Sequence, residues 1–246
     1  MALSGHKPFH DLLTEAHTVV RYDRWGTGLS DRGRTDFAPE RDIEILAELA
    51  DHLKLRRLSL LGPSHGGPLA VAYAIRQPRR VSHLVLYGSR ASALTSGGTW
   101  AALRELILAN WPVAARSVAA VATRGSDPGD VDAFADLLIM AATPQTTVAL
   151  QDAAIGTEMT GLLGDVAVPA LVLHHRDDAL VSADEAVQLA ARIPDARLEL
   201  VDGDRLFISV RTVERHLLNA YTKLGVRGRA QAISWWLRHE PGNRTA

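Results

Sequence analysis

The feature that most constrains the fold of this chain is an apolar run that ends in a Gly-x-Ser-x-Gly pattern. The run covers residues 58–61, the pattern reads Gly62-Pro63-Ser64-His65-Gly66, and a helix-compatible stretch follows at residues 69–75. This order is typical of a nucleophile elbow, a tight strand-to-helix turn that exposes a serine hydroxyl. The flanking glycines let strand and helix approach closely because they carry no side chain. We therefore predict that Ser64 lies on such a turn; a glycine-rich turn with an incidental serine is the alternative.

Strand-like and helix-like segments alternate along the rest of the chain. Short β-branched or apolar runs predict strands, and apolar residues at helical spacing predict helices. The predicted strands cover residues 18–22, 58–61, 81–87, 168–174 and 196–201. The predicted helices cover residues 40–53, 69–76, 183–192 and most of the alanine-rich stretch 92–163. This alternation predicts an α/β fold, a mostly parallel sheet with helices on both faces.

Composition limits the classes of function that the chain can have. Its 246 residues and formal net charge of −1 fit one globular domain with a small appendage, and argue against a protein that coats nucleic acid broadly. The absence of cysteine excludes disulfides, a thiol nucleophile and a cysteine-ligated zinc. His174 and His175 are adjacent on a predicted strand and face opposite ways, so we predict no metal site, and we predict no cofactor.

The sequence also bears on where the protein works. No signal peptide or transmembrane run is visible, which predicts a cytoplasmic protein with no membrane partner. Arginine greatly outnumbers lysine and alanine is abundant, which suggests a GC-rich bacterial gene.

Three motifs in sequence order resemble the α/β-hydrolase superfamily over residues ~8–203. The first is the glycine-punctuated loop Asp23-Arg24-Trp25-Gly26-Thr27-Gly28-Leu29-Ser30-Asp31, and the second is the elbow at Ser64. The third is the run Val168-Pro169-Ala170-Leu171-Val172-Leu173-His174-His175-Arg176-Asp177-Asp178-Ala179-Leu180-Val181. The resemblance implies an α/β-hydrolase-like domain over residues 1–204, with a helical cap over residues ~92–163.

The same resemblance implies roles for three residues in a serine hydrolase. Ser64 stands at the position of the nucleophile, and Asp178, rather than Asp177, stands at the position of the acid that orients the base. The backbone N–H of His65 stands where one oxyanion donor is expected. For the acidic pair the alternative is a solvated turn that also caps a helix.

The base and part of the framework depart from the family pattern. Arg205 or Leu206 stands where the family places its histidine, and neither can act as a base at neutral pH. The loop with the second oxyanion donor, and the strand before it, belong upstream of Met1. We therefore expect an N-terminally truncated domain with exposed sheet edges, and catalysis without a histidine base is left open.

The tail resembles the C-terminal part of a LuxR-type helix-turn-helix over residues ~205–239. The resemblance rests on Thr212-Val213-Glu214-Arg215-His216, Lys223-Leu224-Gly225-Val226 and Arg229-Ala230. It implies a DNA-binding segment over residues 205–246, with DNA contacts from Arg211, Thr212, Arg215 and Lys223. Because the two earlier helices of the family are missing, we expect weak DNA binding; an ordinary amphipathic helix is the alternative.

Together these features predict a LuxR-type DNA-binding transcription regulator that carries an α/β-hydrolase-like sensor or catalytic module. One alternative is an esterase-type serine hydrolase that acts on a small carboxylic ester through Ser64 and Asp178. A second is a non-catalytic small-ligand binder. The predicted partners are DNA and a small-molecule ligand or ester substrate, and a homodimer is left open.

Overall fold

The computed structural model describes residues 11, 13–34, 36–91, 98–123, 128–155, 159–178 and 180–202. The chain divides into two compact units, and nearly all of the described residues belong to the unit Arg21–Leu206. The other unit, Ala2–Val20 with Phe207–Ala246, contains a short helical stretch at residues 13–16. The predicted DNA contacts Arg211, Thr212, Arg215 and Lys223 lie outside the described residues.

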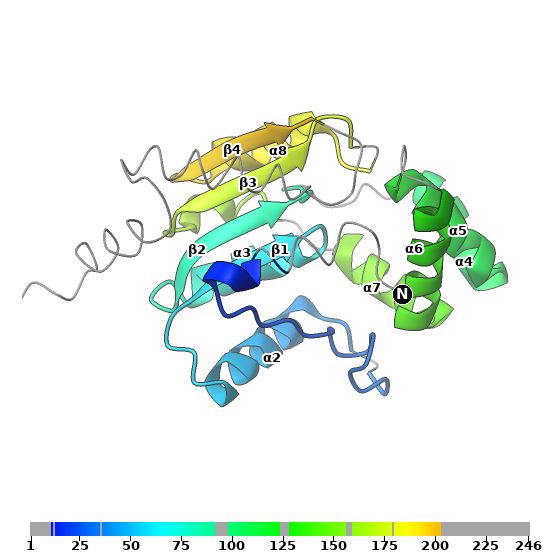
Figure 1. Ribbon diagram of the computed structural model, residues 1–246, viewed down its shortest axis with the longest axis horizontal. Helices are drawn as coiled ribbons and strands as arrows, with labels where there is room; N and C mark the ends of the chain where they lie inside the picture. Colours follow the sequence, from blue (N-terminus) through cyan, green and yellow to red (C-terminus); the bar gives the residue numbers. More distant parts are fainter. Residues whose placement is uncertain are drawn as a thin grey trace, which may run out of the picture. The chain divides into compact units, whose positions relative to one another are not determined.

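The larger unit is built on a four-stranded parallel sheet in the order β1-β2-β3-β4 (Figure 1). The strands are β1 (Leu58–Pro63), β2 (Val81–Tyr87), β3 (Ala170–His175) and β4 (Ala196–Val201). Their carboxyl ends lie at one edge, because Pro63 pairs with Tyr87 and His175 with Val201. The predicted α/β fold with a parallel sheet is confirmed, and the segments after each strand meet at this edge.

The main core forms between the sheet and three helices, α2 (Pro39–His52), α3 (Gly66–Arg76) and α8 (Ala183–Arg192). Helix α3 packs on β1 and β2, α8 packs on β3 and β4, and α2 packs on α3. The largest fully buried side chains of this cluster are Tyr73, Leu84, Leu86, Leu163 and Leu189. Full burial of one such aliphatic side chain stabilises the fold by about 1.5–3 kcal/mol. The core therefore fixes α3 under β1 and β2, where the elbow lies.

Four helices lie between β2 and β3 and have a core of their own. They are α4 (Gly98–Ala109), α5 (Trp111–Ala122), α6 (Pro128–Ala141) and α7 (Pro144–Ile155). Trp111, Ile107 and Val148 are buried together, with Trp100 packed against them. The Trp111 indole N–H donates to the carbonyl of Ala142 at 3.2 Å. These two tryptophans are therefore core residues of the cap, which ends before a short 3-10 turn, η1 (Leu163–Asp165).

Within the described ranges no single helix is long and apolar enough to cross a membrane. The bent pair Pro128–Ala141 and Pro144–Ala154 meets the length and composition criteria only when its two helices are taken together.

The prediction of a strand at residues 18–22 was wrong, because these residues have no regular secondary structure. A strand needs a hydrogen-bonded neighbour, and β1 is the edge of the described sheet. Val20 and Tyr22 are correspondingly exposed.

Candidate active site

Ser64 lies between β1 and α3 with φ = 47°, a left-handed conformation that few residues other than glycine adopt. Its backbone N–H donates to the carbonyl oxygen of Tyr87 at 2.8 Å, which ties the turn to β2. Such strain persists only where the surroundings enforce it, and it occurs often at functional sites. The side chain is exposed at the end of the strand. This is the geometry that a nucleophile elbow requires.

Two glycines make the close contact of strand and helix feasible. A Cβ on Gly62 would lie 2.7 Å from the carbonyl oxygen of Gly66 and 2.9 Å from the Cβ of Ala70. A Cβ on Gly67 would lie 2.3 Å from the hydroxyl oxygen of Ser89. At Gly66 the nearest atom would be Pro63 Cδ at 3.2 Å. The sequence pattern identified Gly62 and Gly66, whereas the structure adds Gly67 as a position with no room for a side chain.

Ser89 supports the elbow from the neighbouring strand end, and sequence reasoning missed it. Its buried hydroxyl oxygen lies 3.0 Å from the carbonyl oxygen of Ser64, 3.2 Å from that of Gly62 and 3.4 Å from that of Tyr87. A hydroxyl has one proton and donates to one of these acceptors at a time. The residue therefore tethers β1, the elbow and β2 from one point. A serine that follows a glycine is too common a pattern to have identified it.

Asp178 follows β3, at the same edge of the sheet as Ser64. Its Oδ1 accepts the backbone N–H of Leu180 at 2.7 Å and that of Val181 at 3.0 Å. Its Oδ2 would lie 3.8 Å from a Cβ on Gly88, which lines the pocket beside Ser64. The structure thus brings Ser64 and Asp178 to neighbouring parts of the sheet edge. It also shows that Asp178 organises its own turn, as the structural alternative expected.

Two buried histidines hold the end of β3 and the turn after it. The Nε2 of His174 lies 2.8 Å from the carbonyl oxygen of Val181, so this nitrogen carries the proton and donates. The Nε2 of His175 lies 2.8 Å from the Tyr87 hydroxyl. Burial, and to a lesser extent the Asp178 carboxylate, raise the pKa of Tyr87. Across the described part of the chain, no group of three or more histidine, aspartate or glutamate side chains is arranged to hold a metal ion.

A partly open pocket lies beside Ser64 and is lined by elements of both the sheet edge and the cap. Its lining includes Ser64, His65, Arg90, Ala154, Met159 and Val181. Although His65 keeps an exposed surface, the packing of protein atoms around its ring removes water and lowers its pKa to about 4. The positive charges of Arg90 and Arg24 add to this effect. The ring is therefore neutral at pH 7, and the positive charge near the pocket comes from the arginines.

A base for Ser64 is missing from the described residues. No histidine ring in these ranges makes a hydrogen bond with the Ser64 hydroxyl, and His174 and His175 have the partners given above. Arg205 and Leu206, which stand at the expected base position, lie outside the described residues. The site thus has the position of a nucleophile, a nearby carboxylate and the His65 backbone N–H.

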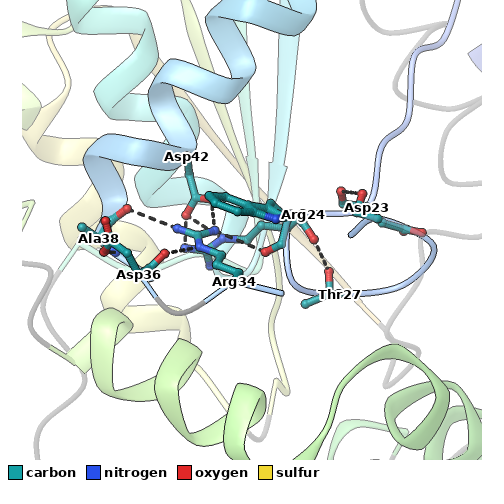
Figure 2. Close-up of polar contacts among 9 residues, drawn as sticks. Asp23, Arg24, Thr27, Arg34, Asp36, Ala38 and Asp42 are labelled. Atoms are coloured by element: carbon teal, nitrogen blue, oxygen red, sulfur yellow. Dashed lines mark hydrogen bonds and ion pairs between the residues drawn. The ribbon is translucent and has the colours of Figure 1, made fainter. Parts of the chain in front are cut away.

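A buried ion cluster shapes the loop that contains Arg24 (Figure 2). Arg24 and Arg34 both pair with the carboxylate of Asp42 on α2, and the Arg24 Nε donates to Oδ2 at 2.7 Å. The side chains of Arg34 and Asp42 are 0% and 3% exposed. The Arg34 guanidinium lies over the rings of Trp25, at 5.3 Å, and Phe37, at 4.8 Å. Trp25 therefore packs in this cluster, and the cluster fixes Arg24 near the His65 ring.

The chain is similar to known proteins in two separate parts. Residues 5–205 match the family model described as serine aminopeptidase, S33, a model of α/β hydrolases. Residues 203–236 match the model for bacterial regulatory proteins of the luxR family.

Individual relatives and structures agree with the first match. The chain is 27% identical to a 2-hydroxy-6-oxo-2,4-heptadienoate hydrolase of Pseudomonas putida, over 76% of this chain and 71% of that protein. It is 26% identical to RutD of Agrobacterium fabrum, a protein named for carbamate hydrolysis, over 79% of this chain and 78% of RutD. The structure of a hydrolase from Oleispira antarctica superposes with a TM-score of 0.78 at 18% identity, covering 88% of this chain and 85% of that one. This last likeness shows the fold.

Proposed function

Since this chain belongs to the α/β-hydrolase family described as serine aminopeptidase, S33, we propose that its hydrolase-like part is the ligand-binding module of a transcription regulator. In this proposal residues 1–204 bind a small molecule and residues 205–246 bind DNA. The observation that carries the proposal is the luxR-family match at residues 203–236, which begins where the hydrolase match at residues 5–205 ends. A hydrolase pocket joined to a DNA-binding segment can report the presence of a ligand to a promoter.

The site supports binding more strongly than turnover. The Ser64 hydroxyl lines the pocket, yet within the described ranges no histidine is hydrogen-bonded to it. A serine hydroxyl is a weak nucleophile unless an adjacent base takes its proton. We therefore infer that the pocket binds a ligand and that turnover is slow.

The DNA-binding half of the proposal is tested by fluorescence anisotropy with a labelled duplex at two salt concentrations. We expect weak, salt-dependent binding, because short helices are marginal on their own and phosphate contacts release counterions. Arg215→Ala should lower the affinity for every DNA sequence. It should also reduce by about 1 the slope of the logarithm of the binding constant against the logarithm of the salt concentration. Arg192→Ala, at the exposed end of α8, is the matched control and should leave both unchanged. Equal binding by Arg215→Ala and wild type would contradict the assignment.

A second candidate function is ester hydrolysis, and the conformation of Ser64 favours it. The strained elbow holds a serine at the pocket, beside the His65 N–H and near Asp178. In this reaction the Ser64 oxygen would attack the carbonyl carbon of a small ester, and its proton would pass through a base to the alcohol oxygen that leaves. Water would then cleave the acyl-serine ester, releasing the acid and restoring the serine hydroxyl. A relative named as a hydrolase of an oxo-dienoate makes a small carbonyl substrate reasonable for this chain too.

A p-nitrophenyl acetate assay separates the two candidates. For the regulator we expect turnover near the uncatalysed rate, unchanged in Ser64→Ala, because removal of a catalytic base lowers the rate by several orders of magnitude. Robust turnover that disappears in Ser64→Ala would establish the hydrolase and show that another group acts as base. Asp177→Ala, an exposed neighbour of the proposed acid, serves as the control for folding and handling.

A further inference from the structure

Among the described residues that line the pocket beside Ser64, Arg90 is the one strongly basic side chain. It follows β2 directly after Gly88, whose positive φ turns the chain at the strand end, and Ser89, which tethers the elbow. Across the pocket stand apolar side chains: Met159 and Val181 are buried, and Ala154 comes from cap helix α7. The pocket therefore pairs one cation with an otherwise largely apolar wall, which is how sites for small amphipathic molecules are commonly built.

The Arg90 guanidinium lacks a fixed partner among the residues that the structure describes. Most other arginines in this unit make an ion pair or a carbonyl hydrogen bond, for example Arg24 and Arg34 with Asp42, and Arg32 with Gly28. For Arg90 the described residues provide neither, and the side chain is half-buried. Its five guanidinium N–H donors thus have no hydrogen-bond partner among the described residues, and such half-buried donors favour a ligand that supplies acceptors.

The electrostatics of the surroundings point the same way. Loss of water lowers the pKa of Arg90, while the carboxylates of Glu185 and Asp178 raise it. Both carboxylates act on Arg90 through their charge, and within the described ranges neither forms an ion pair with it. With His65 neutral at pH 7, Arg90 remains charged at the pocket, and Arg24 adds a second positive field from the loop.

We propose that the pocket beside Ser64 binds a small organic acid, and that the guanidinium of Arg90 pairs with its carboxylate. The planar fork of arginine matches a carboxylate in a two-bond arrangement. The carbon chain of the acid lies against Met159, Val181 and Ala154. This proposal specifies the ligand class of the proposed binding module and rests on that function; it needs no catalysis.

The test measures binding to the full chain by isothermal titration calorimetry. The probes are butanoate, hexanoate and octanoate, each paired with its neutral amide. We expect the acids to bind wild type more tightly than their amides, and Arg90→Met to weaken the acids at least about tenfold while leaving the amides unchanged. Arg90→Lys should give an intermediate affinity, because it keeps the charge and loses the fork.

The control is Arg79→Met, which removes an exposed arginine just before β2, at the other end of that strand from Arg90. It should bind the acids as wild type does, and thermal unfolding of each variant verifies the fold. If acids and amides bind wild type equally, or if Arg90→Met binds acids as wild type does, the carboxylate inference is overturned while the binding module stands. If neither acids nor amides bind wild type, the proposed ligand-binding role fails with it. Should Arg90→Met not fold, the acid–amide comparison and Arg90→Lys still decide.

Discussion

The hydroxyl oxygen of Ser89 lies 3.0 Å from the carbonyl oxygen of Ser64, and the same hydroxyl would lie 2.3 Å from a Cβ on Gly67. The buried Ser89 side chain thus holds the backbone of Ser64 in place and limits the space for a side chain at position 67, on the helix that follows. Ser89 is a positioning residue in this arrangement, because it acts on the site through the backbone of Ser64.

This contact predicts a non-additive pair of substitutions. Gly67→Ala should destabilise the fold by about 1–3 kcal/mol, since the new methyl overlaps the Ser89 side chain. Ser89→Gly removes both atoms that the methyl would overlap and leaves Leu86 Cδ2 at an ordinary contact distance of 3.7 Å, so the same change should cost clearly less in that background. Urea unfolding of the four proteins measures the coupling. Gly161→Ala, where a Cβ meets nothing within 4 Å, is the control, and additive costs would contradict the stated geometry.

The Asp42 cluster predicts a large loss of stability from a small change. Asp42→Ala leaves Arg34, whose side chain is 0% exposed, charged and unpaired in the interior. Removal of one partner of a buried ion pair typically costs about 3–5 kcal/mol. Asp51→Ala, which removes a pair between Arg80 and a 65% exposed carboxylate, should cost less than about 1 kcal/mol. Comparable midpoints of chemical unfolding for the two variants would refute this contrast.

The lowered pKa of His65 predicts a pH dependence with a definite sign. Between about 4 and its ordinary value of 6.5, the unfolded chain binds a proton that the folded ring does not. Stability therefore rises with pH across this window, and the contribution is constant above it. The free energy of unfolding of wild type relative to His65→Gln should fall as the pH is lowered through the window. NMR titration of the His65 ring provides the direct measurement, and a midpoint at 6.5 would show that the ring is not dehydrated.

The two backbone hydrogen bonds that Asp178 Oδ1 accepts predict different effects of an alanine and an asparagine substitution at this position. Asp178→Ala removes the acceptor for the Leu180 and Val181 N–H groups and should cost about 1–2 kcal/mol, because each such bond contributes about 0.5–1.5 kcal/mol. Asp178→Asn keeps that acceptor and should stay within about 0.5 kcal/mol of wild type. Asp177→Ala, at an exposed position, is the neutral control. An equal loss in Asn and Ala variants would mean that charge, rather than turn geometry, holds the loop.

Local sequence signals were sufficient to predict most of the fold. Alternating runs predicted the four strands and the helices α2, α3 and α8, and the Gly62–Gly66 pattern predicted the turn at Ser64. These features depend on neighbours in sequence: β-branched runs, apolar spacing and glycine positions. Residues 18–22 had the same local signal and no strand formed, because pairing depends on a partner elsewhere in the chain.

The finer features of the site depend on contacts between distant residues, which explains why the sequence did not predict them. Ser89 acts across 25 positions on Ser64, and Arg24 meets Asp42 across 18 positions. Arg90 belongs to no sequence motif, and only the fold brings it to the same pocket as Ser64 and Met159. The catalytic role of Ser64 and Asp178 and the DNA contacts of the tail stay predictions.

The separate core of the four cap helices has a kinetic consequence. Ala154 of the cap forms part of a pocket wall, while Ser64 and Arg90 belong to the sheet. The loop after Asp23 meets the cap through few polar contacts: the Gly28 N–H donates to the carbonyl of Ala141, and the Arg32 side chain to that of Met140, each at 2.8 Å. Among the described residues these are the polar contacts between the loop and the cap, so we expect the seam to open at a lower free-energy cost than the unfolding of either body. If a molecule binds in this pocket, we expect its release to depend on how often the seam opens, and hydrogen exchange of the Gly28 amide, which donates across the seam, measures that opening.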